Sequence, residues 1–420
     1  MLRILHTADW HLGHTLHGVS REVEHRAFLV WLVECIARES IDVLLVAGDL
    51  FDSANPPASA MELWYDFIAA AKARAPALNL IFVAGNHDSA ARLDAPCALL
   101  RAFGVHVVGR LPRGEDGAID AERLLIPLRD ARGETVAHCA AVPYIRPADL
   151  PAVRGDADPY IEGVRQVYAS VFRAAMSRRQ LGQALVATGH LYMVDSAVSE
   201  LSERRILGGS QQALPHTLFP RSLTYVALGH MHLAQAVGAD ERIRYCGSPI
   251  PLALDEEPYP HQVVVVEIDA GRLHRQRSVR VPRMVEIWRL PSDGYGRLED
   301  VEALIESLPL LEVGRDDATR PFLELRVHLG QPEPALRQRL AQRLEGRLPR
   351  LLKLSVSVPG PGDAAPASPL RTLSELSAEE VFEARCREQL QGETPEALRR
   401  AFGELLVEIE NATDVISGGA

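Results

Sequence analysis

The hydrophobic residues of the first 282 positions gather in short runs, separated by longer segments in which hydrophobic and polar positions follow a helical period. The runs are rich in Val, Ile and Leu and show no polar alternation, which is typical of strands buried on both faces. Helices are predicted between them, for example over 24–39 and 60–74. This alternation predicts an α/β fold. The predicted strands cover 2–6, 42–47, 78–84, 183–188 and 222–228.

The pattern changes near residue 283. The segments 284–290, 321–328 and 351–357 predict strands, and 297–307 and 334–345 predict helices. Together they predict a small β-α-β-α-β unit. We therefore expect two successive domains, over 1–282 and 283–357.

A segment without hydrophobic periodicity follows the second domain. Residues 358–369, VPGPGDAAPASP, contain four prolines and predict a linker, which we place at 358–372. Beyond it, Ser377 and Glu380 form a capping-box pattern that favours the start of a helix. We expect 373–420 to form a helical arm, whose apolar face either binds a partner or folds back on its own domain.

Composition narrows the class of protein. Of the 420 residues, 47% are hydrophobic and 24% charged, so the chain can bury a sizeable core. No apolar run approaches the roughly 20 residues that span a bilayer. The five cysteines are scattered without a CxxC pair, which argues against a disulfide framework and fits a reducing cytosol. A cytoplasmic location is therefore expected.

The net charge of −11 is unevenly distributed. The arm holds eleven acidic and four basic residues, whereas 283–357 balances at twelve of each. A negative total therefore does not exclude a DNA-binding surface elsewhere. In the second domain, six basic residues between Arg337 and Lys353, against the single acid Glu345, give a local charge of +5, and Arg339, Arg343 and Arg347 among them would share one helix face. This arginine strip either contacts DNA phosphates or is a solvated helix face, and the sequence leaves both open.

The candidate chemistry lies where the predicted strands end. Each of the five strands is followed by side chains that bind metals, and glycine precedes the ligand in four of the five cases. Loops beyond the carboxyl ends of strands converge in α/β sheets, so these side chains are expected to meet. The candidate ligands are Asp9, His11, Asp49, Asn86, His190, His230 and His232.

The types of ligand limit the metal. Carboxylates, an amide oxygen and imidazoles, with no thiolate, suit Mn²⁺, Fe²⁺ or Zn²⁺ better than Ca²⁺. Seven candidates are too many for one tetrahedral ion and fit two ions that share a carboxylate. Such a pair clamps a phosphate, activates water and stabilises the leaving oxygen.

Each motif alone is a weak signal. A DxH or GD pair occurs often by chance, and a lone histidine is more often a hydrogen-bonded core or surface residue. The segments GNHD (85–88) and GHMH (229–232) are rarer. All five motifs in order, each behind a predicted strand, are hard to obtain by accident, so we expect a metal site.

The ordered set DxH, GD, GNHD, GH and GHxH resembles the signature of the calcineurin-like metallophosphoesterases. Longer blocks resemble the SbcD family, the nuclease subunits of bacterial SbcC–SbcD complexes. These include VAGDLFDSANPP (46–57), YCGSPIPLALDE (245–256) and LSELSAEEVF (373–382), the last two specific to that family. The resemblance runs from residue 6 to 382 and covers nearly the whole chain.

The resemblance implies a role for each candidate residue. One ion would be held by Asp9, His11 and His232, and the other by Asn86, His190 and His230, with Asp49 bridging the two. His87 would be catalytic, facing the scissile phosphate and assisting the leaving oxygen. Asp88 would hold the His87 ring in orientation. The cofactors implied are two divalent ions, with Mn²⁺ expected.

The resemblance also implies an architecture and an activity. The fold would be a four-layer α-β-β-α sandwich, with 283–357 as a small α+β capping domain that helps to position DNA. The activity would be that of a duplex exonuclease and a single-strand and hairpin endonuclease in DNA end processing, repair and recombination. The arm at 373–420 would bind the SbcC ATPase. A bacterial heterotetramer is implied, with a homodimer formed through helices near 60–72 and 92–103.

Two other functions compete with this interpretation. A phosphatase or cyclic-nucleotide phosphodiesterase could use the same metal core, although phosphatases usually carry GNHE and an arginine clamp where this chain has GNHDSAAR. A non-catalytic scaffold would have no need for seven convergent ligands. The chain has no GxxxxGK[ST] motif, so no nucleotide is expected to bind it in a P-loop.

Overall fold

The computed structural model describes residues 1–130, 132–153, 158–194, 196, 213–238, 240–331 and 333–358, and short pieces at 381–383, 385–386, 395, 398–399 and 401–403. The chain forms two compact units. Among the described residues, the first unit comprises 1–14 and 20–282, and the second comprises 15–19 and 283–403.

The first unit contains two six-stranded mixed sheets. In one of them, four parallel strands are flanked by an antiparallel hairpin, in the order β14-β13-β1-β4-β5-β6. Its strands are β1 (Leu2–Thr7), β4 (Val43–Ala47), β5 (Asn79–Val83), β6 (Val105–Val108), β13 (Gln262–Asp269) and β14 (Arg272–Arg280). Its helices are α1 (Glu22–Arg38), α2 (Ala58–Arg74), α3 (Ala90–Asp94) and α4 (Cys97–Arg101).

The other sheet has the order β11-β12-β10-β9-β8-β7. Its strands are β7 (Leu125–Arg129), β8 (Thr135–Ala141), β9 (Ala184–His190), β10 (Tyr225–Gly229), β11 (Gln235–Val237) and β12 (Asp240–Tyr245). The 20-residue helix α5 (Pro159–Arg178) covers this sheet. It begins where the Asp158 side chain accepts hydrogen bonds from two backbone N–H groups and proline occupies the first turn.

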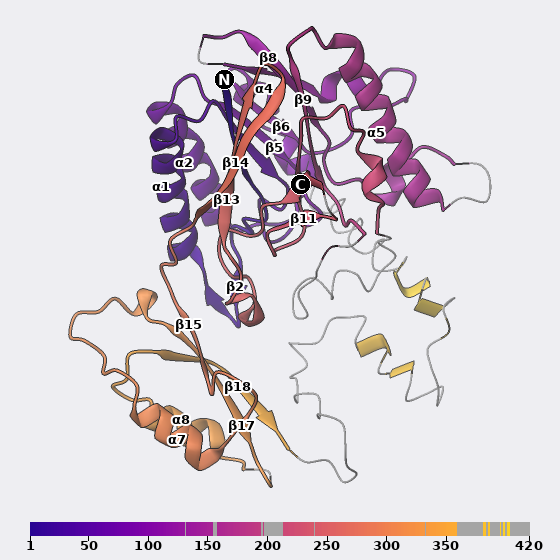
Figure 1. The fold of residues 1–420 in the computed structure, drawn as a ribbon. Helices are drawn as coiled ribbons and strands as arrows, with labels where there is room; N and C mark the ends of the chain where they lie inside the picture. Colours follow the sequence, from indigo (N-terminus) through magenta and orange to yellow (C-terminus); the bar gives the residue numbers. More distant parts are fainter. Residues whose placement is uncertain are drawn as a thin grey trace. The chain divides into compact units, whose positions relative to one another are not determined.

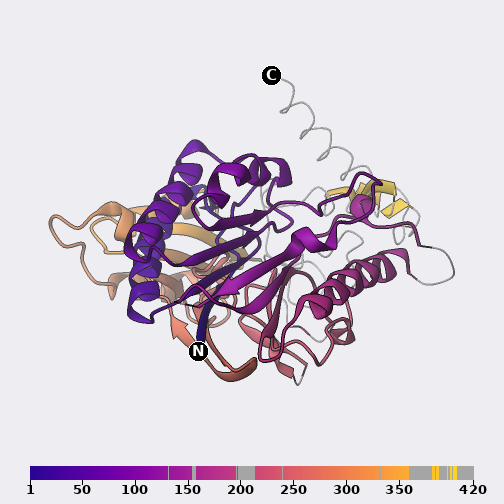
Figure 2. The same ribbon diagram turned by 90° about the horizontal axis from the view of Figure 1, so that it is seen from above.

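These elements form four layers, as the resemblance implied. Helices α1 and α2 pack on the outer face of the first sheet, and α5 on the outer face of the second (Figures 1 and 2). Between the sheets lies a third cluster of buried residues, which includes Ile4, Val43, Val186 and Tyr225. The central strands are buried on both faces because each is covered by a helix layer and by the opposite sheet.

The sequence did not predict every strand of the sandwich. The β13–β14 hairpin pairs antiparallel with β1, and the outer strand β14 is largely half-buried or exposed. Polar residues fill β14, so it lacks the apolar run on which the strand predictions rested. The short elements outside the two sheets are β2 (Thr15–Leu16), β3 (Val19–Ser20) and 3₁₀ turns at Ala121–Leu124, Pro147–Asp149, His216–Leu218 and Leu254–Glu256.

The second unit contains a parallel sheet in which β17 (Phe322–His328) is central. It pairs with β15 (Ile287–Leu290) and β16 (Gly296–Arg297) on one edge and with β18 (Arg350–Ser357) on the other. Helices α7 (Leu298–Glu306) and α8 (Leu336–Arg343) cover one face and bury leucines and valines against it. The β-α-β-α-β pattern predicted from the sequence is confirmed, with β16 and a 3₁₀ turn at Asp317–Thr319 in addition.

Helices α7 and α8 are joined by ion pairs. Arg339 donates to both carboxylate oxygens of Glu302, at 2.6 and 2.8 Å. Arg343 donates to Glu306 at 2.5 Å, and Arg347 donates to a backbone carbonyl. The positive charges of Arg339 and Arg343 are therefore balanced within the unit.

The predicted linker and most of the predicted arm lie outside the described residues. In the described pieces of the arm, the rings of Phe382 and Phe402 stack with their centroids 4.0 Å apart. Arg399 forms an ion pair with Glu383 at 2.6 Å. Across the described parts of the chain, we find no helix long and apolar enough to cross a membrane.

Candidate metal centre

The strand ends of the first unit bring eight candidate site residues together. Their donor atoms form three overlapping groups, within each of which the atoms lie no more than 4.8 Å apart. The groups are Asp9, His11 and His232; His11, Asp49 and His87; and Asp49, His190 and His230. Asn86 joins the last group, because its side-chain oxygen lies 2.9 Å from His190 Nε2 and 3.1 Å from His230 Nδ1.

The loops that carry these residues have unusual backbone conformations. Asp9, His11, Asp49 and His230 all have positive φ angles, which side chains other than glycine rarely adopt. Residues held in such conformations cluster at functional sites, where the surrounding structure compensates the strain. In each of these four cases, the strained residue is also a candidate ligand.

Two glycines allow the loops to approach one another. A Cβ atom on Gly48 would lie 2.2 Å from His190 Nδ1, and one on Gly85 would lie 2.1 Å from Asp49 Oδ1. Real Cβ atoms essentially never come so close to other heavy atoms. The glycines of the GD and GNHD motifs are therefore required for the close approach of neighbouring loops.

Asp49 lies at the middle of the cluster. Its Oδ2 atom is 3.2 Å from His190 Nε2 and 3.5 Å from His11 Nε2. Its Oδ1 atom accepts a hydrogen bond from the backbone N–H of His87 at 2.9 Å. Asp49 is shared by two of the three groups, the one with His11 and His87 and the one with His190 and His230.

The electrostatics of the cluster fit a cation. Burial raises the pKa of Asp9 to about 7, although the nearby His190 and His232 oppose this shift. Burial alone would raise the pKa of Asp49 and lower that of His190, but their mutual attraction outweighs it. The pKa of Asp49 falls well below its usual value, and that of His190 rises to about 9. A divalent ion would supply the positive charge that the His190 proton provides here.

Unpaired buried atoms support the same interpretation. Asp9 Oδ2 and His11 Nε2 are buried and have no hydrogen-bond partner. Leaving such atoms unpaired costs about 1–3 kcal/mol each, so buried polar atoms without partners need an explanation. Metal coordination would satisfy both of them, and the oxygen and nitrogen donors fit a pair of divalent ions.

Three contacts orient the histidines from behind. His11 Nδ1 lies 3.2 Å from Asp52 Oδ1, and His232 Nδ1 lies 2.8 Å from Glu256 Oε1. His190 Nδ1 lies 2.9 Å from the backbone oxygen of Ala47. The carboxylates Asp52 and Glu256 were not predicted from the sequence. One sequence feature could have pointed to them: both lie within the blocks 46–57 and 245–256, which carry the resemblance to the SbcD family.

The predicted role of Asp88 is wrong. Its carboxylate does not contact the His87 ring but accepts hydrogen bonds from three backbone N–H groups, those of Leu50, Phe51 and Gly85. It therefore fastens the loop after β4 to the loop after β5. His87 is instead oriented by Asp52, whose backbone oxygen lies 2.9 Å from His87 Nδ1.

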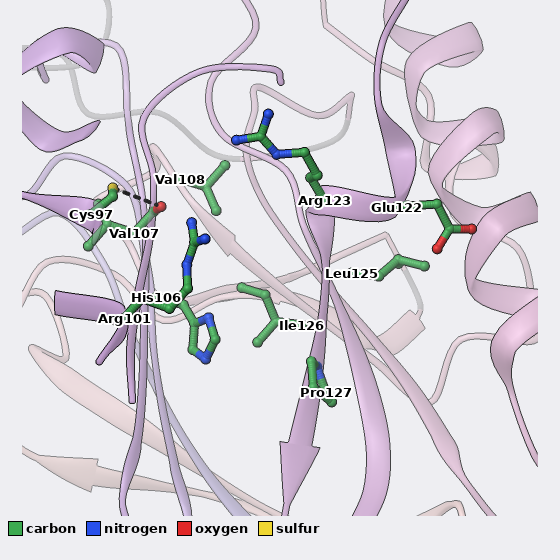
Figure 3. Close-up of a pocket in the computed structure, with 10 residues that line it drawn as sticks. All are labelled: Cys97, Arg101, His106, Val107, Val108, Glu122, Arg123, Leu125, Ile126 and Pro127. Atoms are coloured by element: carbon green, nitrogen blue, oxygen red, sulfur yellow. Dashed lines mark hydrogen bonds between the residues drawn. The ribbon is translucent and has the colours of Figure 1, made fainter. Parts of the chain in front are cut away.

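A hollow of about 180 Å³ lies elsewhere in the first unit, between the edge strands β6 and β7. Figure 3 shows Arg101 and Arg123 on its opposite walls, with Glu122 turned away. Glu122 forms an ion pair with Arg178 at 2.5 Å. None of the eight clustered residues lines this hollow, so it is separate from the candidate metal centre.

Two known families match successive parts of the chain, and the second match begins close to the boundary between the two units. Residues 2–234 match the calcineurin-like phosphoesterase family. Residues 281–389 match the family described as the type 5 capsule protein repressor C-terminal domain.

Three curated relatives are similar over most of their length, and each is named as the SbcD component of the nuclease SbcCD. The protein from Rhodobacter capsulatus is 41% identical over 91% of this chain and 94% of its own. The Escherichia coli K12 protein is 33% identical over 96% and 97%. The Bacillus subtilis protein is 34% identical over 78% and 79%.

Proposed function

This chain belongs to the SbcD family of calcineurin-like phosphoesterases, and we propose that it hydrolyses DNA phosphodiester bonds with two divalent metal ions, both expected to be Mn²⁺. Its family makes it a metal-dependent nuclease. One observation carries the two-ion assignment. Buried donors converge at the strand ends on both sides of a single shared carboxylate, that of Asp49.

The proposed ligand set follows the groups that the fold brings together. Asp9, His11 and His232 hold one ion, and His190, His230 and Asn86 hold the other. Asp49 is shared. The distances within the groups and the buried, unpaired atoms of Asp9 and His11 support this assignment.

The protein's own residues prepare the reaction. A pair of divalent ions supplies charge for the phosphate and a nucleophilic water at neutral pH. Because the backbone oxygen of Asp52 accepts a hydrogen bond from His87 Nδ1, the proton of a neutral His87 ring is fixed there and Nε2 is directed away from that contact. We assign His87 as the catalytic residue: when Nε2 also carries a proton, the ring can donate that proton to the departing oxygen and stabilise its negative charge. It is half-buried, so it remains accessible to a substrate.

The finer assignments rest on the family. We propose exonuclease action on duplex ends and endonuclease action on single strands and hairpins, in DNA end processing, repair and recombination. The ATPase partner would be SbcC, bound by the arm at 373–420, and 283–357 would act as a capping domain. The relatives' names, which specify a component of SbcCD, support a complex of this kind.

A homodimer through the segments near 60–72 and 92–103 is also proposed, and the large apolar residues of these segments differ in exposure. Leu63, Trp64, Phe67 and Leu100 are buried in the core of the first unit. In contrast, Leu99 and Phe103 are 66% and 60% exposed. These two side chains, at and just beyond α4, therefore support a contact between copies.

The main alternative is a phosphatase with the same metal core. Arg92, the arginine of GNHDSAAR, donates to the Asn55 side chain at 2.5 Å. The Asp88 carboxylate accepts hydrogen bonds from three backbone N–H groups. Neither residue belongs to the clustered donor groups, so nothing at the centre favours phosphomonoester recognition over a diester.

The test is nuclease activity of the full chain on end-labelled linear duplex DNA with Mn²⁺. Wild-type protein should degrade the DNA, and the Asp49→Ala and His87→Ala variants should cleave it at least about 10²-fold more slowly. His106→Ala is the matched control, because His106 is also half-buried but lies outside the cluster. Mn²⁺-dependent hydrolysis of a small phosphomonoester, without DNA cleavage alone or with SbcC added, would instead establish the phosphatase alternative.

A further inference from the structure

The two sides of the candidate metal centre are supported differently. On the side of Asp9, both histidines are backed by carboxylates: His11 by Asp52 and His232 by Glu256. The Glu256 side chain is fully buried and is held in place because its other oxygen accepts the backbone N–H of Leu252 at 2.8 Å. This side therefore has a charged ligand, Asp9, and two carboxylate-backed imidazoles.

The side of Asn86 has weaker donors. Asn86 is a neutral amide, in the position that corresponds to Asp9 on the other side. His190 is backed by the peptide oxygen of Ala47 rather than by a carboxylate. His230 presents Nδ1 to the cluster, 3.3 Å from His190 Nε2, and among the described residues no carboxylate is hydrogen-bonded to its ring.

The difference has a direct consequence for metal affinity. A carboxylate that accepts the far N–H of a histidine fixes the tautomer and makes the other nitrogen a stronger donor. Removing such a partner typically costs about 10–100-fold in metal affinity. A peptide oxygen fixes the tautomer but carries no net charge. Asp49 is shared, so it does not distinguish the two sides.

We propose that the two metal sites are unequal, that the Asp9–His11–His232 site binds its ion more tightly, and that Glu256 and Asp52 are positioning residues that create the difference. The inference rests on the proposed two-metal function and deepens it. It also predicts an order of assembly. The Asp9 side is filled first, and the Asn86 side is filled only at higher metal concentration.

The probe is Mn²⁺ alone, added to the full chain after treatment with a chelator. Free Mn²⁺ is followed by its electron paramagnetic resonance signal, and heat is followed by calorimetry. For the wild type we expect two binding phases of one ion each, with dissociation constants at least about 10-fold apart.

Glu256→Gln should weaken the tighter phase by about 10–100-fold and leave the other phase within about 3-fold of the wild type. Asp52→Asn should act on the same phase. Its side chain is 35% exposed, which makes this variant the safer one for folding. It also keeps the backbone oxygen that orients His87. Glu324→Gln in the second unit is the matched control, because Glu324 is buried but contacts no candidate ligand.

Two equal phases in the wild type would overturn the proposal, and so would variants that weaken both phases alike or neither. A separate assay keeps this result apart from the proposed function. If the wild type binds two ions unequally but cleaves no DNA, alone or with SbcC added, the nuclease assignment fails and the inequality stands. If it cleaves DNA while binding two ions equally, only the inequality fails.

Discussion

Two regions of this protein are rich in charged residues, but they use them in opposite ways. At the strand ends of the first unit, buried carboxylates and imidazoles converge, and Asp9 Oδ2 and His11 Nε2 have no hydrogen-bond partner. In the helical pair of the second unit, Arg339 and Arg343 are paired with Glu302 and Glu306. Buried donors that converge and include unpaired atoms indicate a site here, whereas a high density of charge alone does not.

The local geometry explains the difference. Residues at the carboxyl ends of neighbouring strands all lie at one edge of the sheet. They therefore come close together even when their charges do not form complementary pairs. Residues on a helix face meet whatever packs beside them, and α7 offers glutamates to the arginines of α8. A partly exposed pair of this kind contributes little to stability, and it leaves little charge for a ligand.

Asp49→Ala should have the largest effect. It removes the carboxylate shared by both sides, so neither ion is held in place. We expect kcat/KM for DNA cleavage to fall by at least about 10³-fold, since metal ions supply several kcal/mol of transition-state stabilisation. Initial rates on end-labelled duplex with Mn²⁺ measure this. An active variant would contradict the shared role of Asp49.

His87→Ala should separate chemistry from metal binding. A positioned acid or base contributes about 10²–10⁴-fold, so cleavage should fall by that factor. The backbone N–H of residue 87 still donates to Asp49 in the variant, so the Mn²⁺ titration should be unchanged. A variant that loses both ions would show that His87 acts through the metal centre instead.

Acid should destabilise the first unit before the second. His6 joins the two sheets through Tyr225 and the oxygen of Leu228, and burial lowers its pKa to about 3. Because the folded pKa lies below the unfolded value, this stabilisation is complete above pH about 6.5. It is lost as the pH falls from there toward 3, at about 1.4 kcal/mol per pH unit. The described histidine of the second unit's sheet, His328, is exposed instead.

Urea unfolding between pH 7 and 4.5 tests this, followed separately in each unit. His6→Leu provides the control. It should be less stable at pH 7, because two hydrogen bonds are lost, and should show a flatter pH dependence. Equal acid sensitivity of His6→Leu and the wild type would assign the effect to other groups.

Replacing Arg339 and Arg343 by alanine should have the smallest effect. We expect only a small loss in the stability of the second unit, since both pairs are partly exposed and screened by solvent. DNA affinity and its salt dependence should change little. A decrease of about 2 in the magnitude of the slope of log affinity against log salt concentration would instead show that these arginines contact DNA phosphates.

Much of the fold could be predicted from the sequence because the central strands are buried along their whole length. Strands such as β4 and β9 are buried at every position, so their apolar runs are unbroken. Strand β14 was missed because it is an edge strand with a polar sequence, whereas the missed strand β13 does carry an apolar run, Val263 to Val266. Edge strands need no apolar run, and only their pairing identifies them.

The candidate site could be predicted from the sequence to a similar degree. Glycine-preceded ligands at strand ends identified the residues that the fold brings together. The positive φ angles of Asp9, His11, Asp49 and His230 have no signal in the sequence, because tertiary contacts impose them. The roles of Asp52, Asp88 and Glu256 depend on which loop each side chain meets, and that is decided by packing between segments distant in the sequence.

The most direct test of the two-ion centre is anomalous diffraction from crystals of the full chain soaked in Mn²⁺. We expect two peaks on either side of Asp49, about 3.5–4 Å apart. One should lie within bonding distance of Asp9, His11 and His232, and the other of Asn86, His190 and His230. A single peak at saturating Mn²⁺, or peaks that do not share Asp49, would contradict the two-ion centre.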